Sequence, residues 1–237
     1  MPRRHRALLA LPASLTLLAV LSACGSGSSS TTATDPAASA GSSSAASSGA
    51  GSTSCDFEAS GQPAKQVTPP PSTTDLTGKI PATIDTSVGT FDATLDATKA
   101  PCTVASFVSL AKQGYFDNTP CHRLTTQGIY VLQCGDPTGT GTGGPGYTIP
   151  DEVDGTETYG AGTLAMANTG QPHSGGSQFF VVYKDTGLPP SYTVFGSISS
   201  HSVDEVRKVA AKGSDNANGP GDGHPKEKVT ITKVTVG

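Results

Sequence analysis

The sequence lacks the features by which chains bind nucleic acid, anionic membranes or metal ions. Apart from the arginines at its N-terminus it has no cluster of lysine or arginine, and its formal net charge is -4. That charge balance argues against nucleic acid or anionic lipid as the partner. Its histidines and cysteines have no paired spacing of the kind that zinc sites use, so we predict no metal and no other cofactor.

Large apolar side chains are missing from residues 25–54, which are almost entirely Ser, Ala, Gly and Thr. Such a segment cannot bury enough surface to offset the entropy that it would lose on ordering. We therefore predict a flexible tether over residues 24–54 and, after it, a proline-rich lead-in segment over residues 55–81. The remaining residues, 82–237, suffice for one domain with a single well-buried core.

The first 23 residues have the pattern of an export signal. A positively charged start precedes an apolar stretch over residues 7–20, which is short for a membrane span, and small residues follow it. Cys24 comes directly after Leu-Ser-Ala, which resembles a bacterial lipobox, in which the cysteine is lipidated. We predict a signal peptide over residues 1–23 and a lipid anchor at Cys24 that holds the protein outside the cytoplasm at the bacterial cell membrane. Cleavage after Ala23 with a free Cys24 is the alternative, and either the general or the twin-arginine export route stays open.

Strand patterns dominate the sequence after residue 82. Residues 83–86 and 90–96 flank a turn at 87–89 and are typical of a hairpin. Further short strands are predicted over residues 120–124, 129–134, 162–168, 178–183, 193–198 and 228–236. The sequence has no internal repeat, and its periodicity does not distinguish a barrel from a sandwich.

Two segments have helical spacing. Pro101 stands at the start of the first, whose apolar residues recur every three or four positions until Gly114. In the second, Ser202 with Glu205 three residues later predicts the N-cap, and Gly213 predicts the end. The domain is therefore expected to be mainly β with two helices.

Three groups of short motifs follow one another along residues 82–236. They are Cys121-His122-Arg123-Leu124 with Gln133-Cys134-Gly135-Asp136, then Met166-Ala167-Asn168-Thr169-Gly170 with Gly176-Ser177-Gln178-Phe179-Phe180, then Val194-Phe195-Gly196. Their order and spacing resemble the cyclophilin family of peptidyl-prolyl cis/trans isomerases. The resemblance implies a closed eight-stranded antiparallel β-barrel capped by two α-helices, an architecture that leaves no exposed sheet edge. It also implies a monomeric enzyme that acts on proline-containing peptides and unfolded exported proteins.

The reaction of this family sets the chemistry that the site must perform. Rotation about an X-Pro bond faces a barrier of about 20 kcal/mol and breaks no covalent bond, so no nucleophile, metal or general base is needed. Arg123 is the candidate catalytic residue, because its guanidinium stays charged and can donate to the prolyl nitrogen and the preceding carbonyl in the twisted state. Gln133 is expected to hold the guanidinium from across a hairpin, and Gln178 to bind the substrate backbone.

Other candidates for substrate binding come from the resemblance. The family positions that line the proline pocket correspond to Tyr130, Val131, Phe180, Leu188 and Tyr192, the last standing where the family usually has histidine. The main chain at Asn168, with Ala167 and Thr169 beside it, is expected to pair with the substrate next to the proline. Gly141 is expected to line the groove, and His122 to border the pocket.

Four cysteines remain after Cys24. They are Cys55, Cys102, Cys121 and Cys134. An even number in an exported protein suggests disulfides, so we predict two. If Arg123 and Gln133 share one face of their hairpin, Cys121 lies on that face and Cys134 on the other. We therefore expect that these two cysteines do not pair with each other.

The chain departs from the family pattern in three places. The interval from Arg123 to Gln133 is longer by two residues, which enlarges the turn at residues 125–128. Tyr130 replaces the usual phenylalanine. Gly187 falls where many members have tryptophan, a residue that the whole chain lacks. Since that indole is the family's hydrogen-bonding contact to cyclosporin, we expect weak binding of the drug.

Two further signals have an ordinary explanation. Residues 141–146 match the dinucleotide-binding pattern G-x-G-x-x-G, but no helix follows and the prolines indicate a loop, so no nucleotide site is expected. Cys121 and His122 are adjacent on a predicted strand and point to opposite faces, which argues against a thiol-imidazole dyad. By the same alternation, one of Phe179 and Phe180 should face the core and the other the groove.

The leading alternative function is a cyclophilin-like module or chaperone that binds proline-containing segments without useful turnover. Arg123 favours the enzyme, because a pure binder has no need of a cation beside an apolar pocket. A surface adhesin or structural lipoprotein predicts no organised groove, which the three groups of motifs oppose.

Overall fold

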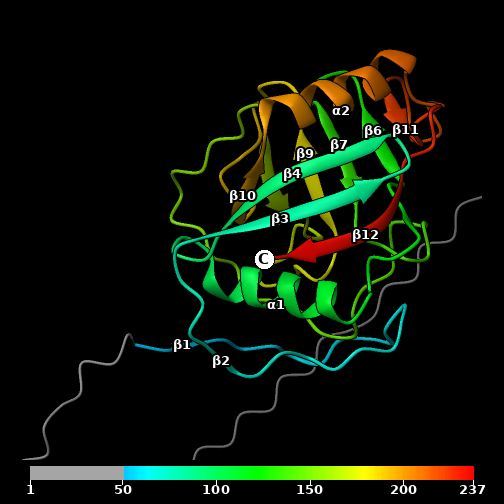
Figure 1. Ribbon diagram of the computed structural model, residues 1–237. Helices are drawn as coiled ribbons and strands as arrows, with labels where there is room; N and C mark the ends of the chain where they lie inside the picture. The colour runs from blue at the N-terminus through cyan, green and yellow to red at the C-terminus, as the bar shows by residue number, and fades with distance from the viewer. Residues whose placement is uncertain (1–50) are drawn as a thin grey trace, which may run out of the picture. The chain divides into compact units, whose positions relative to one another are not determined.

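The computed structural model describes residues 51–237, and one ten-stranded sheet dominates this part of the chain (Figure 1). Its strands, in spatial order, are β11 (Asp222–Gly223), β6 (Arg123–Thr125), β7 (Val131–Cys134), β9 (Phe179–Val182), β8 (Thr163–Met166), β10 (Val194–Ile198), β4 (Gly89–Asp96), β3 (Lys79–Thr86), β12 (Thr230–Val236) and β5 (Thr119–Pro120). Every neighbouring pair is antiparallel. The predictions for the signal peptide, for Cys24 and for most of the tether fall outside the described residues.

The sheet curls so that β3, β4 and β12 lie on one side and β6, β7 and β9 on the other (Figure 1). Its order ends at β11 and β5, and within residues 51–237 no ladder joins these two strands. The expected closed eight-stranded barrel is therefore not confirmed. The reason is local: Cys121 and His122, between β5 and β6, leave the ladder, so that β5 pairs with β12 whereas β6 pairs with β7.

Helix α1 (Pro101–Lys112) begins and ends as the sequence predicts. Pro101 occupies the first turn, where its missing N–H costs nothing. The carboxylate of Glu152 accepts from the next two backbone N–H groups, each at 2.8 Å, and so caps the helix from a distant loop. Gly114 adopts a positive φ of 65° just beyond the helix end, which glycine allows without strain.

Helix α2 (Ser200–Lys212) starts earlier than predicted. Its N-cap is Ser199, whose hydroxyl accepts from the N–H of Ser202 at 3.2 Å. Ser202 is not the cap because it lies inside the first turn, where its hydroxyl accepts from the N–H of Asp92 on β4 at 2.8 Å. No helix within residues 51–237 has the length and apolar character needed to cross a membrane.

Four phenylalanines fill the space between α1 and the sheet. Phe107 on α1 lies 5.0 Å from Phe116, 5.5 Å from Phe179 and 5.3 Å from Phe195, measured between ring centroids. All four are almost fully buried, and burial of such a ring contributes about 1.5–3 kcal/mol. Phe180, one residue along β9, belongs to a separate apolar cluster with Val131 and Tyr159. The prediction that Phe179 and Phe180 face opposite sides is confirmed.

The four cysteines form two disulfides as predicted, but the expected pairing is wrong. Cys55 bonds to Cys102, and Cys121 bonds to Cys134. The strand alternation that argued against the second bridge holds only within a strand, and Cys121 lies outside β6. Its N–H donates to the carbonyl of Val229 at 2.8 Å, so the backbone has left the β6 ladder before Arg123.

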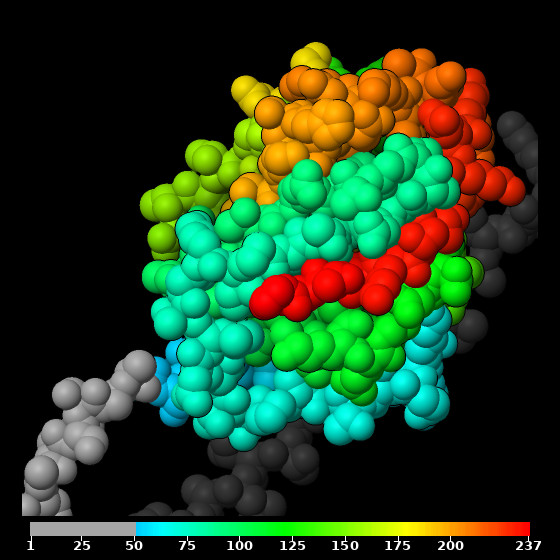
Figure 2. Space-filling view, in the orientation of Figure 1, coloured from blue at the N-terminus to red at the C-terminus, as the bar shows by residue number. Residues whose placement is uncertain are grey.

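The lead-in segment packs against the domain along much of its length. Strands β1 (Thr53–Ser54) and β2 (Thr73–Thr74) pair with each other below α1 (Figure 1). The ammonium group of Lys65 donates to the carbonyls of Tyr115 (2.9 Å) and Asp117. Figure 2 shows this segment, in cyan, against the lower edge of the domain. It is therefore part of the folded body and borders the site described next.

Candidate active site

Arg123 and Gln133 stand directly opposite each other on β6 and β7. The guanidinium of Arg123 donates through Nη1 to Oε1 of Gln133 at 3.3 Å. Its other edge forms a bidentate pair with Asp222, in which Nε lies 2.8 Å from Oδ1 and Nη2 lies 2.6 Å from Oδ2. Two side chains thus hold the guanidinium from two sides, and the sequence predicted only one of them.

Asp222 reaches Arg123 because the connection between α2 and β12, which contains β11, is folded back on itself. The side chain of Asn216 accepts from the N–H of Gly221 at 2.7 Å, and the carbonyl of Gly221 accepts from the N–H of Thr126 at 2.7 Å. Gly223 has no room for a Cβ, which would lie 2.1 Å from Oδ1 of Asp215. The enlarged turn at residues 125–128 therefore contacts the loop that presents Asp222.

The ion pair shifts the pKa values of both partners in the direction that keeps them charged. Hydrogen bonding to Arg123 lowers the pKa of Asp222 despite the opposing effect of its partial burial. Hydrogen bonding to Asp222 raises the pKa of Arg123, again against burial. The guanidinium and the carboxylate are therefore both ionised throughout the neutral pH range.

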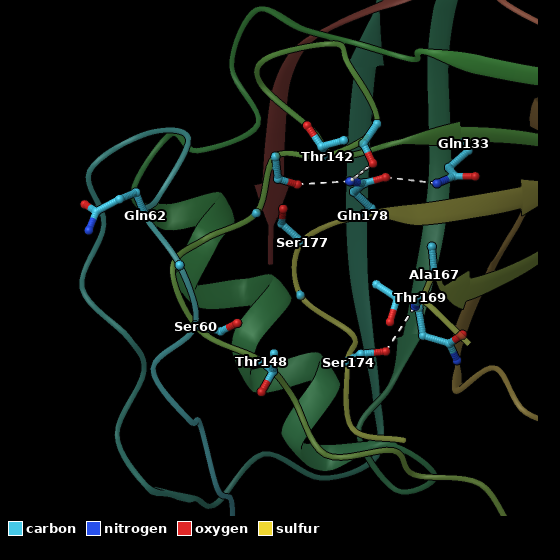
Figure 3. A pocket seen from close by; sticks show the side chains of 16 residues that line it. Ser60, Gln62, Gln133, Thr142, Thr148, Ala167, Thr169, Ser174, Ser177 and Gln178 are labelled. Carbon is cyan, nitrogen blue, oxygen red and sulfur yellow. Dashed lines mark hydrogen bonds between the residues drawn. The ribbon is translucent and has the colours of Figure 1, made fainter. Parts of the chain in front are cut away.

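A chain of hydrogen bonds continues from Arg123 across the sheet. Nε2 of Gln133 donates to Oε1 of Gln178 at 2.9 Å, and Nε2 of Gln178 donates to the carbonyls of Gly141 (2.9 Å) and Gly143 (3.0 Å) (Figure 3). Below that loop the fully buried carboxylate of Asp136 accepts from the N–H groups of the same two glycines, at 2.8 and 3.0 Å. Gln178 thus fixes the glycine-rich loop relative to the strand that carries Gln133.

Beside Arg123 lies a small cavity of about 150 Å³, named here the Phe180 cavity. It is lined by Arg123, Ile129, Val131, Gln133, Ala167, Asn168, Phe180, Leu188 and Tyr192. The rings of Phe180 and Tyr192 pack edge to face with centroids 5.4 Å apart and form its apolar side. An apolar cavity of roughly this size accepts benzene in another protein, so a five-membered ring fits.

The structure does not bring every predicted residue to this cavity. Tyr130 is outside it: its ring packs against Tyr183, and the ammonium of Lys184 lies 4.2 Å from its centroid. The carbonyl of Tyr130 accepts from the N–H of Tyr183 at 3.2 Å, so the pairing of β7 with β9 continues to Tyr130, and alternation turns its side chain away from the face of Val131 and Gln133. Ile129, which the motif comparison missed, takes the place predicted for Tyr130.

His122 is also absent from the Phe180 cavity. It is buried, and a Cβ added to Gly141 would lie 3.4 Å from its ring. Within residues 51–237 neither of its ring nitrogens has a hydrogen-bond partner. Burial lowers the pKa of His122, although the carboxylate of Asp136 opposes this. The imidazole is therefore neutral at pH 7 and supports the glycine-rich loop from below.

The remaining predicted residues border a second cavity of about 580 Å³, named here the polar cavity. Gly141, Thr169 and Gln178 line it alone, whereas Ala167 and Asn168 line both cavities. The side chain of Asn168 donates to the carbonyl of Ser191 at 2.9 Å, which leaves its main chain at the border of the two cavities. No cluster of three or more potential metal ligands exists within residues 51–237.

Comparison with known sequences matches the domain to one family. The family described as cyclophilin type peptidyl-prolyl cis-trans isomerase/CLD matches residues 82–236. The probable peptidyl-prolyl cis-trans isomerase B of Mycobacterium tuberculosis is 47% identical over 179 residues, covering 67% of this chain and 57% of that protein. The protein of the same name from Mycobacterium leprae is 42% identical over 201 residues, covering 76% of this chain and 66% of that protein. The chain therefore spans less than two thirds of the length of these relatives.

Solved structures show the same fold. A crystal structure of a cyclophilin type peptidyl-prolyl cis-trans isomerase from Cryptosporidium parvum has a TM-score of 0.59 and 28% sequence identity, covering 68% of this chain and 98% of that one. A second crystal structure of that protein, in the presence of the dipeptide Ala-Pro, has a TM-score of 0.56 at the same identity and covers 66% and 98% of the two chains.

Proposed function

The chain belongs to the family of cyclophilin-type peptidyl-prolyl cis-trans isomerases, and we propose that it accelerates the isomerisation of X-Pro bonds in exported proteins. The observation that carries the proposal is the position of Arg123, whose guanidinium lies at the edge of the Phe180 cavity and is held by Asp222 and Gln133. A cation so placed serves a reaction in which the prolyl nitrogen gains electron density.

The proposed mechanism separates binding from catalysis. The proline ring enters the Phe180 cavity, and the adjacent substrate backbone runs along the main chain at Asn168. Of the five N–H donors of a guanidinium, two bond Asp222 and one bonds Gln133, which leaves two for the substrate. When the peptide bond twists, its nitrogen becomes pyramidal and basic, so these donors bind the twisted state more tightly than either planar isomer.

A cis/trans exchange assay tests the activity directly. The chain is added to a peptide with a central Ala-Pro bond, and NMR exchange spectroscopy measures the interconversion rate at catalytic protein concentrations. We expect exchange far above the uncatalysed rate, which lies on the order of once per 10–100 s. Saturable binding of the peptide without faster exchange would instead support the non-catalytic binding module.

The proposal extends to location and organisation. We propose that residues 1–23 are a cleaved signal peptide, that Cys24 carries the lipid anchor, and that the chain from Cys24 to residue 50 tethers the folded body, which includes the lead-in segment from β1 onward. A Ser/Gly-rich chain of about 30 residues spans roughly 30 Å on average, enough to hold the domain clear of lipid headgroups. We also propose that the enzyme acts as a monomer.

Lipidation of Cys24 makes a direct prediction. Cells that express the protein are grown with an azido-fatty acid, and the purified protein is tested for label. We expect strong labelling of the wild type and of the control variant Ser26→Ala, and background labelling of Cys24→Ala, because stable anchoring requires acyl chains on that thiol. Equal labelling of the wild type and Cys24→Ala would contradict the anchor without affecting the proposed isomerase activity.

A further inference from the structure

The polar cavity adjoins the Phe180 cavity along a shared border. Gln133, Ala167 and Asn168 line both of them. An extended peptide advances about 3.3 Å per residue, so a substrate whose proline occupies the Phe180 cavity can place a side chain in the polar cavity only a few residues away.

One wall of the polar cavity comes from outside the region that matches the family. Ser60, Gly61 and Gln62 of the lead-in segment line it, whereas the family match begins at residue 82. Figure 3 shows this stretch facing the loop that carries Thr142 and the side chain of Gln178, with the hydroxyl of Ser60 turned toward the cavity and the amide of Gln62 turned away. Residues 58–64 are called the lead-in wall below.

The lead-in wall is held in place by backbone hydrogen bonds and by a disulfide. The N–H groups of Ser60 and Ala64 donate to the carbonyls of Gly146 (2.9 Å) and Gly144 (2.8 Å). The carbonyl of Glu58 accepts from the N–H of Thr148 at 2.8 Å. Just before the wall, the disulfide from Cys55 to Cys102 in α1 fastens the chain covalently. The wall is therefore a fixed boundary of the cavity.

The lining of the polar cavity is hydrogen-bonding and without ionisable side chains. Its sixteen residues are serines, threonines, glutamines, glycines, one asparagine and one alanine. The amides of Gln133, Asn168 and Gln178 already have partners, so hydroxyls such as that of Ser60 and the glycine backbone are the groups that face a ligand. The nearest buried charge is the carboxylate of Asp136, behind Gly141 and Gly143. A neutral polar side chain can exchange its bonds to water for bonds to this lining. A carboxylate would meet no cation and would approach the charge of Asp136.

We propose that the lead-in wall turns the polar cavity into a selective subsite, which takes a neutral, hydrogen-bonding side chain of the substrate near the proline and disfavours a carboxylate. This inference rests on the proposed isomerase function and adds a substrate preference to it. The lead-in segment then contributes to recognition as well as linking the domain to the tether.

Two series of peptides test the subsite. Each carries a central Ala-Pro bond and has Gln, Glu or Ala at one of the three positions before that Ala-Pro pair or the three after it, and kcat/KM is measured by NMR exchange. With the full chain, we expect Gln to exceed Glu at one of these positions by about fivefold, the value of one net hydrogen bond.

The variant Ser60→Tyr fills the cavity from the lead-in wall and should remove the preference for Gln over Ala and Glu. Gln66→Tyr is the matched control, because Gln66 is exposed on the same segment and does not line the cavity, and it should keep the wild-type preference. Thermal melting of both variants checks that they are folded. An active wild type without any preference, or a preference that survives in Ser60→Tyr, overturns the subsite alone. A wild type that accelerates no peptide overturns both the subsite and the proposed isomerase function.

Discussion

Replacing Arg123 with alanine should slow cis/trans exchange of an Ala-Pro peptide by about 100-fold or more while leaving peptide affinity nearly unchanged. In the proposed mechanism, ground-state binding comes from the apolar side of the Phe180 cavity, formed by Phe180 and Tyr192, and from the main chain near Asn168, and the substitution leaves both in place. The guanidinium acts on the twisted state, and a loss of about 3 kcal/mol there alone corresponds to roughly 100-fold in rate.

Two further variants separate charge, geometry and binding. Arg123→Lys keeps the charge but loses the planar fork, so it should recover only a small part of the lost rate. Phe180→Ala removes an apolar wall of the Phe180 cavity. It should weaken both peptide affinity and turnover, because burial of the proline ring stabilises the planar, bound peptide and the twisted state alike. NMR titrations and exchange rates are measured on the same samples. Near wild-type exchange in Arg123→Ala would remove Arg123 from the mechanism.

Local signals in the sequence predicted the elements that position the site. Pro101 and Gly114 bound α1 because proline and glycine act on the backbone at the residue itself. The alternation of Phe179 and Phe180 assigned one ring to the core and one to the site. The pairing of Arg123 with Gln133 needed only a short hairpin, so motif spacing was enough to anticipate it.

The wrong predictions concern residues that lie next to strands and not within them. Alternation placed Cys121 wrongly because the chain leaves the ladder between β5 and β6, directly after Pro120, which the prediction of one strand over residues 120–124 did not take into account. Tyr130 was assigned to the site from its motif position, but in the structure Ile129 shares the face of Val131. In both cases the residue lies just outside a strand, where alternation read from the sequence does not fix which way a side chain points.

Contacts between distant segments were beyond sequence reasoning. Asp222 lies 99 residues from Arg123 and stands in a Gly-Pro-Gly-Asp-Gly stretch that indicates only a turn. The lead-in segment was predicted as a proline-rich connector, yet its backbone forms one side of the polar cavity. A half-buried arginine needs an anionic partner, so the sequence indicated that Arg123 pairs with an acidic residue. It did not indicate which of the several acidic residues that partner is.

Asp222 has two opposing effects on the proposed reaction. Its bidentate contact fixes the plane of the guanidinium, which favours catalysis because misoriented donors do not reach the prolyl nitrogen. Its negative charge offsets part of the positive charge that stabilises the twisted state. The side chains of Arg123 and Asp222 are 33% and 27% exposed, so solvent weakens the effect of the Asp222 charge on the twisted state. Solvent does not weaken the effect of Asp222 on the orientation of the guanidinium. We therefore expect orientation to prevail.

On this reasoning, Asp222→Asn should lower kcat by about tenfold, which corresponds to about 1.4 kcal/mol, with little change in KM. Asparagine offers one acceptor oxygen in place of two and carries no charge, so the guanidinium becomes mobile without altering the Phe180 cavity. Asp222→Glu restores both oxygens and should recover part of the rate. Asp204→Asn breaks the exposed pair with Arg207 on α2 and serves as the control with unchanged kinetics. A variant Asp222→Asn that is faster than the wild type would show that the charge effect prevails.

The pH profile gives a second measure of the same pair. Because Arg123 lowers the pKa of Asp222 below its ordinary value of about 3.9, the pair is fully formed above that value and is lost as the pH falls through the lowered pKa. We therefore expect the ratio of wild-type to Asp222→Asn kcat to be constant from about pH 5 to pH 8, and to fall toward one only as the pH drops well below about 3.9, through the lowered pKa of Asp222. Circular dichroism at each pH confirms that both proteins are folded. A ratio that changes around neutral pH would mean that another group, with His122 as the first candidate, controls the orientation of Arg123.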